Sequence, residues 1–142
     1  MAEVVYNNAK GRDLSSGTYK MLLLKTAPAG CANPDLDTIT ALLAVSTAAE
    51  CDFTNYVRKT LASVTRTVDD TNDRVAFDAS DVTWTSAGGA SNNTPAAAVI
   101  YLDVDGTDAN AVPMTYHDTG FGVTATNGGN FVVAISDFAR VG

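Results

Sequence analysis

Hydrophobic residues in this chain gather in short runs and in alternations with polar residues, a pattern that favours β-strands over helices. The first apolar run lies within residues 18–26 and is followed by residues 27–30, Ala-Pro-Ala-Gly, which predicts a buried strand that ends in a loop. One segment has helical spacing instead, because its apolar residues from Leu36 to Leu43 fall on one face. We therefore expect a single short helix, with Asp35 as its N-cap.

The second half of the chain repeats the alternating pattern. Residues 59–68 alternate along their whole length and predict one strand, which turns at Asp69–Asp73 and pairs back through residues 74–78. Further strands are predicted at residues 4–6, 81–85, 96–103, 112–117 and 131–135, and residues 138–141 either continue the last strand or close an edge. Residues 96–103 are apolar on both faces, so we expect this strand at the centre of its sheet.

These elements predict an all-β fold. About eight strands, spaced about 8 to 20 residues apart, favour an antiparallel β-sandwich that is jelly-roll-like and carries one short helix. The length of 142 residues suits one domain over residues 1–142, with a short N-terminal arm over about residues 1–8. The order of the strands does not follow from the sequence.

Charge divides the chain into two parts. Residues 1–74 hold nine acidic and eight basic residues, whereas residues 75–142 hold seven aspartates and one base, Arg140, so the two parts contribute −1 and −6 to the net charge of −7. A nucleic-acid surface needs clustered Lys and Arg against the phosphates, and nothing after Arg74 supplies such a cluster. We expect no direct contact with nucleic acid. The low charged fraction of 18% fits either a surface covered by a partner or a surface rich in Ser, Thr and Asn.

The two cysteines, Cys31 and Cys51, could close a loop of about 20 residues or remain thiols. The first residues show no basic segment followed by a long apolar stretch, and no run reaches the ~18 apolar residues that span a bilayer. We therefore expect a protein that is made and used without export, holds both cysteines reduced and has no membrane contact.

Candidate chemistry is sparse. His117 is the single histidine and lies beside Asp118, but no nucleophile motif accompanies it. Residues 103–108 resemble a calcium loop only in part, because glycine falls at the fourth position and Met114 stands where a bidentate Glu belongs. Residues 120–125 match G-x-G-x-x-A, yet no helix is predicted after them. We expect no catalytic residues, no cofactor, no metal site and no enzymatic activity.

Three blocks of residues resemble a family of small virion proteins of tailed bacteriophages. The blocks are Tyr6–Arg12, Val68–Trp84 and Ala98–Tyr101, and their order and spacing are similar to the family over most of the chain. The chain departs from the family between Pro28 and Tyr56, the segment that holds the predicted helix and both cysteines.

The resemblance implies a head decoration, or cement, protein with a jelly-roll-like sandwich that binds the outside of a capsid and stabilises it. The implied partners are the major capsid protein and further copies of the chain, as a dimer rather than a trimer. The implied location is the capsid surface of the virion, after synthesis in the cytoplasm of the bacterial host. The expected capsid contacts are an arm of Tyr6, Asn7, Asn8, Lys10 and Arg12, with Tyr56, Arg58 and Lys59 near it.

A different class of function remains an alternative. Trp84, Tyr101 and Tyr116 could form stacking platforms for sugars, which would suit a tail-fibre or receptor- and carbohydrate-binding module. The same aromatic residues would otherwise belong to the core of the sandwich. Electron microscopy of particles with and without the protein would separate a head protein from a fibre protein, and a glycan array would test binding of sugars.

Overall fold

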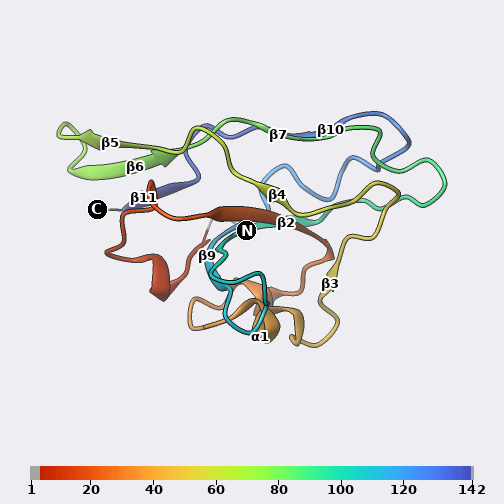
Figure 1. Ribbon diagram of the computed structural model, residues 1–142, viewed down its shortest axis with the longest axis horizontal. Helices are drawn as coiled ribbons and strands as arrows, with labels where there is room; N and C mark the ends of the chain where they lie inside the picture. Colours follow the sequence, from red (N-terminus) through yellow and green to blue (C-terminus); the bar gives the residue numbers. More distant parts are fainter. Residues whose placement is uncertain (1–3, 142) are drawn as a thin grey trace.

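The computed structural model describes residues 4–141, and β-strands account for most of its regular structure (Figure 1). Within these residues the strands are β1 (Val4–Val5), β2 (Tyr19–Thr26), β3 (Ala49–Glu50), β4 (Lys59–Thr60), β5 (Thr65–Asp69), β6 (Arg74–Asp78), β7 (Val82–Trp84), β8 (Ala97–Leu102), β9 (Val112–His117), β10 (Phe131–Val133) and β11 (Ala139–Val141). The helical elements are the α-helix α1 (Ile39–Leu43) and two 3-10 turns, η1 (Asn7–Ala9) and η2 (Ala29–Ala32).

The largest sheet has the strand order β1-β9-β8-β2-β3, and β4 also pairs with β2. Strand β8 lies between β9 and β2, and its first five residues are buried, which confirms the central position expected from its apolar faces. It pairs with β2 over six consecutive residues, from Tyr19 opposite Leu102 to Leu24 opposite Ala97. This long antiparallel pair is the centre of the main sheet.

A second layer of strands lies over the main sheet (Figure 1). It contains the three-stranded sheet β11-β6-β5 and the two-stranded sheet β10-β7. Because β6 leads into β7 and β10 leads into β11, the pairs β11-β6 and β10-β7 form one antiparallel ladder that is interrupted in the middle. At the interruption the Asp81 carboxylate accepts a hydrogen bond from the Ile135 N–H at 2.8 Å. Every strand pairing is antiparallel, which confirms the all-β antiparallel sandwich, while the jelly-roll connectivity stays a prediction.

The main sheet is covered on both faces because successive side chains of a strand point to opposite sides. Met21 and Leu23 of β2 pack with Trp84 and other residues of the second layer. Leu22 and Leu24 of the same strand pack on the other face, in a core that includes Ile39 and Leu42 of α1. Figure 1 shows α1 on the side of the main sheet away from β5, β6, β7 and β10. The short helix therefore closes the second core.

The helix differs from the prediction at its N-terminus. It begins at Ile39, and its N-cap is Thr38, whose hydroxyl accepts a hydrogen bond from the Ala41 N–H at 3.0 Å. The expected cap, Asp35, instead accepts a hydrogen bond from the side chain of Asn7. Thr38 has the extended backbone of a cap, so the prediction of the helix is confirmed and that of its cap is wrong.

The strand predicted at residues 59–68 is two strands. Strand β4 ends at Thr60 and pairs with β2, whereas β5 begins at Thr65 and pairs with β6 in the other layer. Between them Ser63 adopts a positive φ of 54°, a backbone that non-glycine residues rarely take. The chain therefore crosses between the two sheets here. Alternation of polar and apolar residues continues through the crossing, so it does not reveal the break.

Candidate interaction surfaces

The N-terminal segment is part of the fold over the residues that the structure describes. Val4 and Val5 pair with Tyr116 and Thr115 of β9, so β1 is an edge strand of the main sheet. Tyr6 is fully buried, and its hydroxyl donates to the Cys31 carbonyl. Burial raises the pKa of Tyr6 above its usual range. The predicted arm is therefore wrong for residues 4–8, and Tyr6 is a core residue rather than a surface contact; residues 1–3 lie outside the described part.

The residues after Tyr6 are held against the loop that precedes α1. The Asn7 N–H donates to the Pro34 carbonyl at 2.9 Å, and the Asn8 side chain donates to Asp37 at 3.2 Å. The cations make local contacts: Lys10 Nζ lies 2.8 Å from Asn7 Oδ1, and Arg12 Nε lies 2.7 Å from the Asn8 carbonyl. Asn7, Lys10 and Arg12 are exposed, so this docked segment still offers a polar surface.

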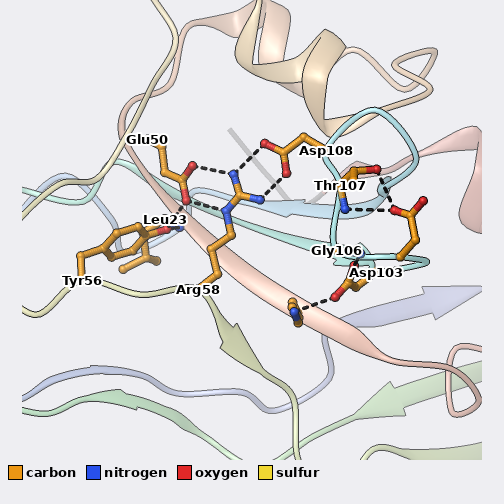
Figure 2. A network of polar contacts seen from close by, with 10 residues as sticks. Leu23, Glu50, Tyr56, Arg58, Asp103, Gly106, Thr107 and Asp108 are labelled. Atoms are coloured by element: carbon orange, nitrogen blue, oxygen red, sulfur yellow. Dashed lines mark hydrogen bonds and ion pairs between the residues drawn. The ribbon is translucent and has the colours of Figure 1, made fainter.

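Arg58 is the centre of a network of ion pairs between segments distant in the chain (Figure 2). Its guanidinium makes two hydrogen bonds of 2.7 Å to Glu50 of β3 and two, of 2.5 and 3.0 Å, to Asp108 in the loop after β8. It also lies 5.5 Å from the centre of the Tyr101 ring, within the range of a cation–π contact. Hydrogen bonds to Glu50 and Asp108 raise the pKa of Arg58 further above its usual range. Arg58 is therefore committed to internal partners.

Tyr56 belongs to the same network. Its hydroxyl donates to Glu50 at 2.7 Å and accepts from the Leu23 N–H at 3.0 Å, as Figure 2 shows. Its ring stacks on Trp84, with the ring centres 6.5 Å apart. Burial, with Glu50 nearby, raises the pKa of Tyr56 above its usual range. Tyr56 and Arg58 thus hold β2, β3 and the β8–β9 loop together, and neither is an open surface contact.

The structure does not bring the two predicted contact groups together. The segment of Asn7 to Arg12 follows β1, at one edge of the main sheet, whereas Lys59 lies in β4, which flanks β2 near the other edge. Strands β9, β8 and β2 lie between β1 and β4, a width of roughly 19 Å at the usual strand spacing. The expectation that Tyr56, Arg58 and Lys59 lie near the N-terminal residues is therefore wrong.

The acidic loop between β8 and β9 is longer than a tight Asp-Gly hairpin. Asp103 pairs with Lys20 at 2.6 Å and accepts from the Gly106 N–H, and these contacts hold its pKa below the usual range. Asp105 accepts hydrogen bonds from Thr107 and Asn110, which lower its pKa in the same way. Among residues 4–141 no group of three or more His, Cys, Asp or Glu side chains is placed to hold a metal ion.

The three aromatic residues considered as sugar platforms are buried. Trp84 is fully buried, and its indole N–H donates to the Val57 carbonyl at 2.7 Å. Tyr101 and Tyr116 are 3% and 1% exposed and lie in the core on the opposite face of the main sheet. Three side chains that are buried and divided between two cores form no shared platform, so this basis for a carbohydrate-binding module is wrong.

The remaining candidate groups also have structural surroundings. Cys31 and Cys51 are both buried thiols, one in each core, which confirms the expectation of no disulfide between them. Burial raises the pKa of Cys31 and brings that of Cys51 to about 12. His117 Nε2 lies 2.9 Å from the hydroxyl of Thr115 in the same strand. Gly120 and Gly122 both take positive φ values, and the G-x-G-x-x-A segment lies in a loop.

The predicted hairpin of β5 and β6 lies at one end of the molecule (Figure 1), but sequence reasoning missed how exposed β5 is. Thr65, Arg66, Thr67 and Val68 are all exposed, and Val68 is 54% exposed. A groove of about 330 Å³ lies at the turn of the hairpin, with Val68, Val75 and Val141 among its lining and the acidic residues of the turn at its side. The alternation of residues 64–68 predicted a two-faced strand, but gave no sign that both faces are open.

A second hollow differs from the hairpin groove in its charge. It has a volume of about 360 Å³ and is lined by Pro95, by residues between 119 and 124 and by residues 130–134 around β10. None of its lining residues is charged. The molecule therefore carries a charged groove at the β5–β6 turn and an uncharged one beside β10.

Comparison with family models, with curated proteins and with solved structures finds no match for this chain. Among the described residues no helix is long and apolar enough to cross a membrane. The interpretation of the surfaces therefore rests on the geometry above and on the resemblance in the sequence.

Proposed function

We propose that this chain is a viral structural protein that binds the outside of a phage capsid and stabilises it, as a cement or decoration protein. The observation that carries the proposal is the contrast between a main sheet covered on both faces and a hairpin with an exposed edge strand. A protein that acts by holding its neighbours needs a rigid body and an accessible surface for protein contacts.

The resembling residues occupy connected parts of this fold, which supports the proposal. The block Val68–Trp84 runs from the end of β5 through β6 to β7, and the block Ala98–Tyr101 lies in the central strand β8. The block Tyr6–Arg12 contains the buried Tyr6 and the docked polar segment after it. The similarity therefore extends over both sheets rather than over one isolated loop.

The proposal includes a direction for the capsid contact. The shell-facing surface is the one that presents Asn7, Lys10 and Arg12, because these side chains are exposed and combine an amide with two positive charges. Asp103 and Asp108 of the acidic segment pair with Lys20 and Arg58, whereas Asp81 and Asp105 are exposed and suit a side that faces solvent. The partners are the major capsid protein and further copies of this chain, and weak single contacts suffice because symmetric repetition raises the effective concentration.

The test is rebinding to capsids from which the protein has been stripped. We expect the purified chain to rebind and the decorated capsids to withstand more heat or salt than bare ones. Arg12→Glu should weaken rebinding about tenfold, since it reverses a charge at the contact. Arg140→Glu is the matched control, because this arginine is also exposed and its ion pair with Asp137 spans only three positions of the chain.

Two results would overturn the proposal. One is that decorated and bare capsids break at the same temperature, and the other is that electron microscopy places the protein on tail fibres. Equal effects of Arg12→Glu and Arg140→Glu would leave the cement role intact but contradict the assigned shell-facing surface. Circular dichroism of each variant checks that the fold survives.

A further inference from the structure

Strand β5 has an edge that no other strand occupies within the described residues. It pairs with β6 on one side, and the order β11-β6-β5 places it at the border of its sheet. An exposed edge strand presents unpaired N–H and C=O groups and accepts a further strand readily. All five residue pairs of β5 with β6 are regular and β5 contains no proline, so neither a bulge nor a proline blocks this edge. The edge is short and carries the charged residues Arg66 and Asp69, so a partner strand must match these charges.

The charges of β5 make it complementary to a second copy of itself. In an antiparallel pair around a two-fold axis perpendicular to the sheet, facing residues point to the same side, so one residue must face its own copy. The central residue can be Arg66, Thr67 or Val68. A centre at Arg66 would place two arginines face to face, which is repulsive.

A centre at Val68 is the complementary arrangement. It places the two half-exposed Val68 side chains against each other. It also brings Arg66 of each copy opposite Asp70 of the other, the first residue of the turn after β5, so the pairing runs one residue beyond the strand. Arg66 and Val68 lie opposite Phe77 and Val75 of β6, so they share the face on which Val75 and Val141 line the hairpin groove. A centre at Thr67 gives neither contact, because Arg66 then faces Val68 and Thr65 faces Asp69.

We propose that two copies of this chain pair antiparallel through β5, with Val68 at the two-fold axis and Arg66 opposite Asp70 across the interface. The pairing joins two three-stranded sheets into one of six strands, β11-β6-β5 and its copy. The β5 pairing rests on the proposed function, because it names the surface through which neighbouring copies on a capsid shell would be joined. The isolated strand pair is small, so the association is weak in solution.

Charge exchange tests the register. Sedimentation of the purified full chain over roughly 1 µM to 1 mM should show a monomer–dimer equilibrium. Arg66→Asp and Asp70→Arg should each weaken it at least about tenfold, because each places like charges opposite one another. The double variant Arg66→Asp with Asp70→Arg restores the opposite charges and should recover the dimer. Asp73→Arg changes the same turn without an opposing partner in this register and should leave the dimer unchanged.

Crosslinking tests the axis. Val68→Cys places two thiols face to face, so mild oxidation should give a disulfide-linked dimer. Val57→Cys is the control, because Val57 is 55% exposed against 54% for Val68 but lies outside the hairpin. A monomer throughout the concentration range, a failure of the double variant to recover, or equal crosslinking of the two cysteine variants would each overturn the β5 interface. These measurements need no capsid, so their failure is distinct from failure of the proposed function.

Discussion

Strands β8 and β5 have similar lengths but opposite surroundings. The first five residues of β8 are buried, with side chains in both cores, whereas the first four residues of β5 are exposed. Among the strands of residues 4–141, β8 has neighbours on both sides and β5 has one neighbour. We call the main sheet, α1 and the strands β7 and β10 that pack on it the body of the molecule. The difference indicates that packing around β8 stabilises the body, whereas the hairpin of β5 and β6 keeps an edge open to other proteins.

The largest difference between these regions should appear on truncation of an apolar side chain. Ile100→Ala in β8 should lower the free energy of unfolding by about 2–5 kcal/mol, because it leaves a cavity in a closed core. Val68→Ala in β5 should change it by less than about 0.5 kcal/mol, since the side chain is already half exposed. Urea unfolding measures both. A comparable loss for Val68→Ala would show that packing of the hairpin contributes to the free energy of unfolding as much as packing around β8 does.

The second comparison concerns two arginines. Arg58→Ala should cost about 2–3 kcal/mol, since it leaves the carboxylates of Glu50 and Asp108 without their shared cation in a half-buried site. Arg74→Ala in the hairpin should cost less than about 0.5 kcal/mol, because Arg74 pairs with one carboxylate, Asp69, which is only five positions away in the same hairpin. Denaturant unfolding of both variants tests this. Equal costs would contradict the role of Arg58 as a link between segments of the body.

High pH should destabilise the body through Cys51. Its pKa is raised to about 12 by burial, against about 8.5 in the unfolded chain, so the protonated thiol stabilises the fold fully below about pH 8.5. That contribution is lost as the pH rises towards about 12. Between about pH 8 and about pH 10.5, the melting temperature of Cys51→Val should therefore fall less than that of the wild type. The pKa of Tyr116 is also raised to about 12, so the variant should still lose some stability at high pH. Identical curves of melting temperature against pH for the two proteins would contradict the prediction.

The smallest effect is expected from calcium on the acidic loop of the body. Asp103 and Asp105 already accept hydrogen bonds from the loop or pair with Lys20. Millimolar calcium should therefore leave the melting temperature unchanged, whereas a ligand bound only to the native state would raise it by mass action. A rise of several degrees that Asp105→Asn abolishes would show that this loop, rather than the hairpin, carries a binding site.

Local patterns of the sequence were enough to predict the strands that packing reinforces. Residues 112–117 form β9 as predicted, and the doubly apolar run around Val99 forms the central strand. The turn at the Asp-rich segment and the return strand of residues 74–78 are also confirmed. The period of a strand and the apolar or polar character of its faces can be read along the chain, because both follow from residues close together in the sequence.

Partners that are distant in the sequence were decided only by the tertiary structure. Arg58 meets Asp108 fifty positions away, and Tyr6 is buried against Cys31, so two expected surface residues are internal. The alternation of residues 59–68 was correct for each strand but hid the crossing between sheets at Ser63. The sequence determined where strands form and which of their faces are apolar. Which strand stays at an open edge depends on the packing of the whole chain, because a face or an edge is buried only when another segment lies against it.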